Sequence, residues 1–410
     1  MIPDESLHRL GKYKLGLLVN SDLDSWKVLR KCLVESIGRP KFLKGLVPKI
    51  GGYLAELTDS LDRLADAGVP ILVNELMGLV SMDIILNIIF SEKREAAIIY
   101  GDGIAEGKKV KPDPALAMVH KVMDAGGFYG KVPPFIYKYI LRGKDKLHRE
   151  SVLQWMRYTE ERVRQKQTEV SASTNNEHMD FATSLFLTAE SLCPDQNTVF
   201  KQVVSTIRET IGGGTDTSSN TMAFLIYELA RNKALADQIS DEVVRAVDAS
   251  GIIDHDSLSR MPFLEAAITE IGRTCSLVAG LTRYLSEDTL VDGMVLKKGA
   301  HLVIANSMNH SDPEVWENPQ LFDPTRFMKK PAKPEGPHGF GWAFSPFGYG
   351  VRRCPGQELA LIEMKIVMAT LCRRYRFRLA DPLQSLEIHE SSVRECGPLP
   401  IIFEKREHNQ

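Results

Sequence analysis

The chain contains 410 residues, of which 51 are basic and 53 acidic, so its formal charge at pH 7 is −2. Hydrophobic residues make up 43% and charged residues 25%, the proportions of an ordinary folded protein. This balance excludes a disordered chain and a collagen-like repeat. The near-neutral charge also argues against a nucleic-acid partner, which needs a basic surface. The length allows two or three domains or one large domain.

The first 280 residues have mainly helical periodicity. The run from Leu76 to Phe90 is apolar, but at 15 residues and with Asp83 and Asn87 inside it, it is too short and too polar to span a membrane. It predicts a buried core helix. The polar stretch 166–179 predicts a flexible loop. The apolar spacing predicts helices over residues 26–36, 54–66, 76–90, 150–166, 198–231, 234–248 and 261–274.

After residue 280 the pattern changes to short strand-like pieces separated by turns. A Pro- and Gly-rich coil follows over 311–346, and the spacing predicts a last helix over 355–374. The predicted strands are Thr282–Leu285, Thr289–Val291, Met294–Leu296 and Ala300–Ile304. The sequence therefore predicts a mainly α protein with a small sheet.

One cysteine has an unusual environment. The six cysteines are scattered and form no CxxC pair, which argues against a disulfide framework or a zinc site. Cys354, however, precedes Pro355 at a predicted helix start, where free amides and the helix dipole favour a thiolate. A metal bound by one thiolate needs its other ligands from elsewhere, and a porphyrin supplies four. The pattern therefore indicates a cysteine-ligated haem.

The surrounding segment, Phe347-x-x-Gly350-x-Arg352-x-Cys354-x-Gly356, resembles the haem loop of the cytochrome P-450 family, the haem-thiolate monooxygenases. The resemblance implies haem b with Cys354 as the axial iron ligand. It also implies that Phe347, Arg352 and Gly356 take part in cofactor binding. The fold implied is a single cytochrome P-450 domain over residues 1–410, with a large helical part and a small β-rich region.

A second motif lies in the predicted helix 198–231. Gly212, Gly213 and Gly214 each cost a helix about 1 kcal/mol relative to alanine, which suggests a kink or bulge with a purpose. The run through Asp216 and Thr217 resembles the family's oxygen-binding motif, which implies that both are catalytic. Thr217 would assist oxygen activation, and Asp216 would deliver protons for O–O cleavage. Alternatively, the Thr217 hydroxyl bonds back to the preceding turn.

Further residues resemble the family's structural and propionate-binding positions. Glu270 and Arg273 resemble its ExxR pair, which with Arg326 implies a buried charge network behind the haem loop. Gly272 and the absence of a proline in 274–278 depart from the family pattern. The likeness also makes the following residues candidate haem-propionate contacts: Trp26, Arg30, Arg283 and Arg352. An exposed strand arginine remains the alternative for Arg283.

Only 25 residues precede Trp26, whereas family members carry a small sheet and several helices there, and eukaryotic members add a membrane anchor. We therefore expect an N-terminally truncated form of a eukaryotic, membrane-type member. The full-length protein would lie on the cytoplasmic face of the endoplasmic reticulum membrane.

The resemblance implies a monooxygenase that takes O₂ and a small-molecule substrate. The apolar turn 277–281, with Met222 and Ala223, favours a lipophilic substrate. No flavin or nicotinamide motif is present, so an NADPH-dependent flavoprotein reductase is the expected electron donor. Its predicted docking patch is Arg353, Lys365, Arg373 and Arg374. Two alternatives stay open: a haem-thiolate isomerase or dehydratase, and a non-catalytic haem-binding or haem-free product.

Overall fold

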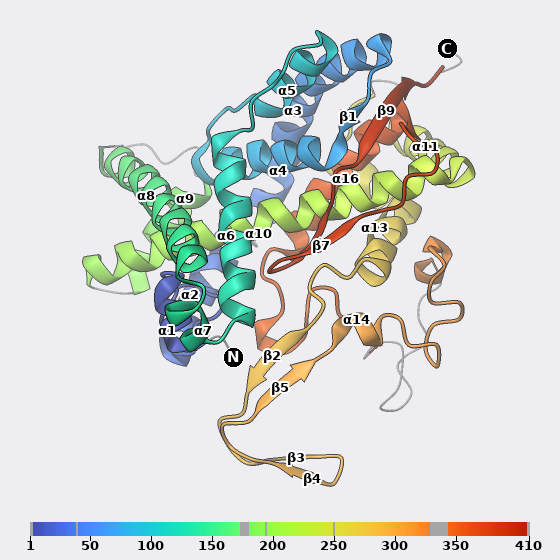
Figure 1. Ribbon diagram of the computed structural model, residues 1–410. Coiled ribbons are helices and arrows are strands. Elements are labelled where there is room, and N and C mark those ends of the chain that lie inside the picture. The colour runs from blue at the N-terminus through green and yellow to red at the C-terminus, as the bar shows by residue number, and fades with distance from the viewer. Residues whose placement is uncertain are drawn as a thin grey trace.

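The computed structural model describes residues 3–37, 40–172, 180–192, 195–248, 251–328 and 343–407. These segments form a mainly helical protein with four small antiparallel sheets, which confirms the predicted fold class. The long helix α10 (Gln196–Arg231) crosses the middle of the molecule (Figure 1). The helix α4 (Val73–Phe90) packs along it, and α16 (Gln357–Arg374) packs on the same central region.

The predicted helices are all present, with shifted ends. The remaining helices of the described residues are α1 (Asp4–Arg9), α2 (Leu23–Ile37), α3 (Pro40–Ala67), α5 (Ala96–Ala105), α6 (Pro114–Lys131), α7 (Pro134–Tyr139), α8 (Arg142–Ala172), α9 (Phe181–Leu192), α11 (Lys233–Ala246), α12 (His255–Ser259), α13 (Pro262–Thr274) and α14 (Asn306–Asn309). Two short 3₁₀ helices, η1 (Pro324–Phe327) and η2 (Gly350–Arg352), lie in the C-terminal coil.

Two helices are longer than their local sequence suggests. The helix α3 begins at Pro40, before the predicted start at residue 54, and continues through Pro48, a residue that disfavours a helix interior. Its buried positions Val47, Ile50 and Leu54 keep helical spacing, so packing on the core outweighs the proline. The helix α8 runs to Ala172, so the predicted loop over 166–172 was wrong. Residues 173–179 lie outside the described segments.

The strands form small antiparallel sheets at the edges of the helical body. The predicted strands after residue 280 are confirmed as two hairpin-like pairs, and the β3–β4 pair projects away from the body (Figure 1). The other two sheets have the strand orders β1–β9–β6 and β7–β8. The strands are β1 (Ile71–Leu72), β2 (Leu281–Tyr284), β3 (Thr289–Val291), β4 (Met294–Leu296), β5 (His301–Ile304), β6 (Tyr375–Leu379), β7 (Ile388–Glu390), β8 (Arg394–Cys396) and β9 (Pro400–Lys405).

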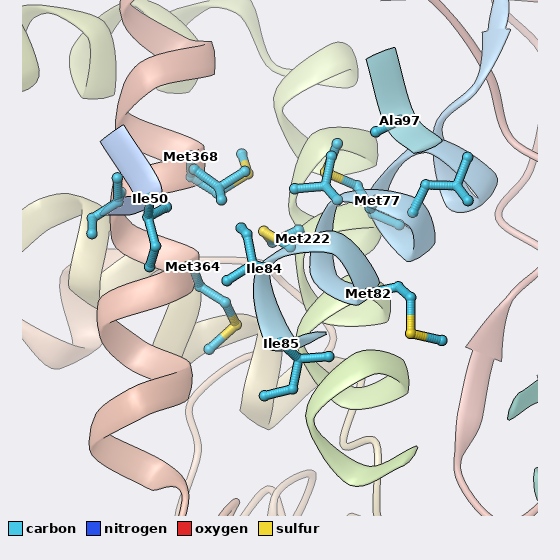
Figure 2. Close-up of a cluster of buried hydrophobic side chains, with 14 of the residues drawn as sticks. Ile50, Met77, Met82, Ile84, Ile85, Ala97, Met222, Met364 and Met368 are labelled. Carbon is cyan, nitrogen blue, oxygen red and sulfur yellow. The ribbon is translucent and has the colours of Figure 1, made fainter. Parts of the chain in front are cut away.

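The central core lies where α4, α10 and α16 meet (Figure 2). The helix α4 is long and apolar enough to cross a membrane, but 78% of that window is buried inside the protein. This burial agrees with the predicted core helix. Met222 and Ala223 also lie in this core and are fully buried, Met222 beside Ile84 of α4. Because their side chains fill the core, the expectation that they face a substrate was wrong.

Candidate functional site

The loop before α16 holds Cys354 at the protein surface. The Cys354 amide donates a hydrogen bond to the Phe347 carbonyl over 2.8 Å, which closes the loop on itself. Gly348 and Gly350 have φ values of 71° and 66°, a left-handed conformation that favours glycine. Among the five cysteines that the structure describes, Cys354 alone is exposed. The loop therefore offers this thiol to a ligand.

Opposing effects act on the Cys354 thiol. Desolvation by the loop raises its pKa, whereas the Gly356 amide and the guanidinium groups of Arg30 and Arg353 lower it. Gly356 is the N-cap of α16, which begins at Gln357 and not at the predicted Pro355. The amide and the two guanidinium groups only partly offset desolvation, so the pKa of Cys354 stays above its ordinary value and the protein alone does not produce the thiolate that the sequence predicted at this helix start.

Three arginines from distant segments lie together near this loop: Arg30 of α2, Arg283 of β2 and Arg352 of η2. Burial lowers the pKa of Arg352, and the positive charges of Arg283 and Arg30 lower it further. No ion pair joins any of the three to a carboxylate within the described residues. A cluster of mutually repelling guanidinium groups without a counter-charge is a strong binding site for an anion.

Trp26 and the segment before α2 hold this cluster in place. The Arg352 guanidinium lies 3.9 Å from the centre of the buried Trp26 ring. It also donates hydrogen bonds to the carbonyl groups of Leu17, at 3.3 Å, and Asn20, at 2.9 Å. On the other side of the loop, Arg30 donates to the Arg353 carbonyl over 2.6 Å. The predicted propionate contacts are thus brought together around one loop.

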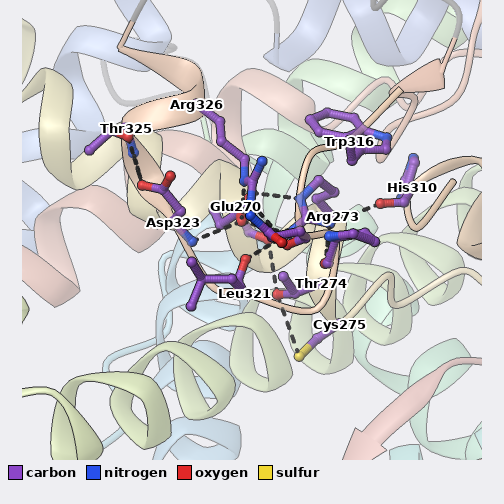
Figure 3. A network of polar contacts seen from close by, with 12 residues as sticks. Glu270, Arg273, Thr274, Cys275, His310, Trp316, Leu321, Asp323, Thr325 and Arg326 are labelled. Carbon is purple, nitrogen blue, oxygen red and sulfur yellow. Dashed lines mark hydrogen bonds and ion pairs between the residues drawn. The ribbon is translucent and has the colours of Figure 1, made fainter. Parts of the chain in front are cut away.

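A buried charge network lies around Glu270 and Arg273 of α13 (Figure 3). Arg273 donates to both carboxylate oxygens of Glu270, at 2.7 and 2.8 Å, and Arg326 of η1 lies 3.5 Å from the same carboxylate. Arg273 also donates to the carbonyl groups of His310, Pro319 and Leu321. The pair therefore fixes the coil that leads to the cysteine loop, as the resemblance implies.

His310 connects this coil directly to the cysteine loop, a role that the sequence did not reveal. Its Nε2 atom accepts a hydrogen bond from the Ser345 amide over 3.0 Å. Burial and the nearby Arg273 charge lower the pKa of His310 to about 4, so the ring is neutral and able to accept. Asn306 contacts the Ser345 hydroxyl at 3.1 Å.

The glycines of α10 bring this helix close to its neighbours. A Cβ atom on Gly212 would lie 3.0 Å from Met123 of α6, and one on Gly214 would lie 3.0 Å from Ile85 of α4. Gly213, in contrast, is exposed, and a Cβ atom there would meet nothing within 4 Å. Gly212 and Gly214 therefore allow close packing between helices, whereas Gly213 faces open space. The helix is continuous through them, without the predicted bulge.

Asp216 and Thr217 lie next to each other on α10 but in different environments. The Thr217 hydroxyl donates to the Gly213 carbonyl over 2.7 Å, the back-bonding that the sequence left as an alternative. Asp216 is buried, and neither of its carboxylate oxygens has a hydrogen-bond partner in the part of the chain that the structure describes. Burial, together with the charges of Glu395 and Asp124, raises the pKa of Asp216 to about 8. At neutral pH Asp216 is therefore a buried carboxylic acid that still carries its proton.

The predicted basic docking patch was wrong in most of its members. Lys365 is 6% exposed and donates to Glu265, at 2.8 Å, and to a backbone carbonyl. Arg374 forms an ion pair with Asp62, and the Arg373 guanidinium donates to a backbone carbonyl. Only Arg353 of the four is exposed without an acidic partner in the described segments. Helical position alone did not reveal which cations the neighbouring elements cover.

These residues fit a haem. A porphyrin supplies four nitrogen ligands to its iron, and the exposed Cys354 thiol could supply a further one. Its two propionates need cations, and Arg30, Arg283 and Arg352, which form no ion pair with a carboxylate in the described segments, could supply them.

Comparison with known proteins agrees with this reading. The family model "Cytochrome P450" matches residues 4–399. Cytochrome P450 3A7 of Homo sapiens is 25% identical over 389 residues, which cover 90% of this chain and 71% of the relative. Cytochrome P450 3A12 of Canis lupus familiaris is 25% identical over 91% of this chain and 72% of its own. "Sterol 26-hydroxylase, mitochondrial" of Homo sapiens is 31% identical over 46% of this chain and 35% of its own. The chain therefore belongs to the cytochrome P450 family.

Proposed function

We propose that this chain is a monooxygenase that inserts one oxygen atom from O₂ into a lipophilic small molecule, with electrons from a separate NADPH-dependent flavoprotein reductase. The observation that carries the proposal is the exposed Cys354 thiol beside three arginines that form no ion pair with a carboxylate among the described residues. Family membership supports the haem-dependent oxygen chemistry, because members bind haem b through a cysteine thiolate.

The residues around the site are assigned different roles. Bound haem supplies the oxygen-activating chemistry. Cys354 would bind the haem iron, and Trp26, Arg30, Arg283 and Arg352 would hold the propionates. The network around Glu270 keeps the cysteine loop in position.

Asp216 and Thr217 of α10 are assigned to proton transfer and hydrogen bonding. Asp216 is protonated at neutral pH because burial and neighbouring carboxylates raise its pKa to about 8, so it can donate. The Thr217 hydroxyl is held on the carbonyl of Gly213, where an added Cβ atom would meet nothing within 4 Å. We assign proton delivery to Asp216 and hydrogen bonding of the reacting oxygen to Thr217.

The substrate side is apolar. The turn 277–281 is half-buried, and Leu281 lies within contact distance of the cysteine loop at Gly348. A lipophilic substrate fits this surface. We further propose that the protein acts at the cytoplasmic face of the endoplasmic reticulum membrane. Cell fractionation tests this location, and recovery with mitochondria, as in the name of one relative, would contradict it.

A carbon-monoxide difference spectrum of the reduced, purified chain tests the proposal. We expect the band typical of thiolate-ligated haem in the wild type and in the control Cys275→Ala, which changes a buried cysteine on another element. Cys354→Ala should lose it. Absence of haem from the wild type would favour the non-catalytic alternative. Turnover with peroxide substrates that needs neither reductase nor NADPH would favour an isomerase or dehydratase.

A further inference from the structure

The buried Asp216 carboxyl faces a corner formed by α6, α10 and the β7–β8 pair. The Nε2 atom of His120 on α6 lies 3.7 Å from the Oδ1 atom of Asp216. Asp124, one turn further along α6, and Glu395 of β8 are the acidic groups that raise the pKa of Asp216. The β7–β8 pair is fixed to α10 because the Cys396 amide donates to the Asn220 side chain over 2.6 Å.

The Asp216 side chain is shielded from bulk solvent. Asp216 is 1% exposed, and its two carboxylate oxygens accept no hydrogen bond from any described residue. The His120 side chain, in contrast, is 41% exposed. His120 therefore touches solvent on one side and faces the buried carboxyl on the other. Histidine is also the side chain that most readily takes up and releases a proton near neutral pH.

A purely structural ion pair explains this arrangement poorly. A site built to hold an ionised Asp216 would surround it with cations and hydrogen-bond donors, which lower a carboxyl pKa. The corner instead places Asp124 and Glu395 near it, and both disfavour the ionised form. The same two carboxylates attract cations and protons to the corner, which suits a group that collects protons from solvent.

We propose that His120 transfers protons from solvent to Asp216 and so resets Asp216 after each proton delivery. The inference rests on the proposed role of Asp216 as the proton donor. In the step, protonated His120 gives its Nε2 proton to the Asp216 carboxylate, and the neutral ring regains a proton from a buffer acid at its exposed edge. One proton moves inward and no electron moves. The 3.7 Å gap is longer than a hydrogen bond, so a small side-chain movement or one bridging water completes the contact. His120 acts only through Asp216 and is thus a positioning residue.

Time-resolved infrared spectroscopy on the ferric, haem-loaded enzyme tests this path without turnover. The carbonyl band of protonated Asp216 is identified by its loss in Asp216→Asn, and a pH jump then follows its protonation. We expect His120→Gln to slow this protonation at least tenfold while the final band remains. The control Lys121→Gln, which removes the neighbouring exposed charge on α6, should behave as the wild type.

An unchanged protonation rate in His120→Gln, or no Asp216-dependent band at neutral pH, would overturn the proposal. His120→Asn provides a second variant if the glutamine variant does not fold. The measurement is independent of oxygenation. If His120→Gln slows the protonation of Asp216 but the wild type oxygenates no substrate, the proton path stands and the proposed function is refuted. Normal oxygenation with unchanged protonation would refute the path alone.

Discussion

Replacing Glu363 by glutamine should stabilise the protein, increasingly so as the pH rises. Glu363 of α16 is fully buried, and its Oε1 atom accepts a hydrogen bond from the Ser81 hydroxyl of α4 over 2.8 Å. Burial raises the pKa of Glu363 from 4.5 to about 8, although the hydroxyls of Ser81 and Ser218 oppose the shift. In the folded protein the group is therefore neutral, whereas the unfolded chain ionises it above pH 4.5.

This difference in pKa determines both the sign and the size of the effect. The folded pKa is raised, so the stability is fully present below the unfolded pKa of 4.5 and is lost progressively as the pH rises towards 8. One pKa unit corresponds to about 1.4 kcal/mol, so the loss reaches about 1 kcal/mol at pH 5 and about 3 kcal/mol at pH 7. Glutamine keeps the shape and an acceptor for Ser81 but does not titrate, so Glu363→Gln removes the loss.

Thermal unfolding of the haem-loaded protein at pH 5 and pH 7 measures this effect. For a chain of this length, about 3 kcal/mol raises the Tm by about 4 °C, so the advantage of Glu363→Gln should grow from about 1 °C at pH 5 to about 4 °C at pH 7. The control Glu358→Gln, at an exposed position of the same helix, should show equal differences at the two pH values. A Glu363→Gln advantage that does not grow with pH would refute the reasoning.

Three further changes test the scaffold and the electron path. Arg273→Lys keeps the charge but loses the planar fork that makes five hydrogen bonds, so we expect about 3 kcal/mol less stability, a lower Tm and reduced haem content. Gly214→Val should lower the Tm because its Cβ would lie 3.0 Å from Ile85, whereas Gly213→Ala should not. Arg353→Glu should slow reduction by the reductase severalfold in stopped-flow measurements and weaken its salt dependence.

Each of these three has a matched control. Arg378→Lys, in an exposed pair with Glu404, should leave the Tm and haem content unchanged, and an equal loss there would contradict the role of burial. Equal Tm values for the two glycine variants would contradict the packing argument. Lys201→Glu makes the same charge change as Arg353→Glu, but at an exposed site on a different element, α10. An equal slowing of reduction in Lys201→Glu would remove the evidence for docking at Arg353.

Local patterns were enough to predict much of the helical fold. The helices over 76–90, 198–231 and 261–274 are present because their apolar positions recur at helical spacing and are buried. The pattern failed where local propensity and tertiary burial disagree. The helix α3 begins before its predicted start and contains Pro48, because the buried face continues past that proline. The strands β1, β6, β7, β8 and β9 were also not predicted; of these, the two-residue β1 has no period of its own and exists only through its pairing with β9.

The cysteine loop was predictable because its information is contiguous: two glycines with positive φ, a cation and Cys354 lie within seven residues. The supporting contacts were not. His310 accepts a hydrogen bond from Ser345, 35 residues away, and its place in the sequence predicts no such contact.

The sequence alone therefore determined the class of fold, the family resemblance and the identity of the thiol, because helical spacing and the cysteine loop are local properties of the chain. Only the tertiary structure brought Arg30, Arg283 and Arg352 together, buried Lys365 against Glu265, and placed His120 beside the buried Asp216. The physical reason is that an amphipathic pattern specifies which face of a helix is buried but not which partner covers it. The charge and protonation of each polar side chain depend on that partner.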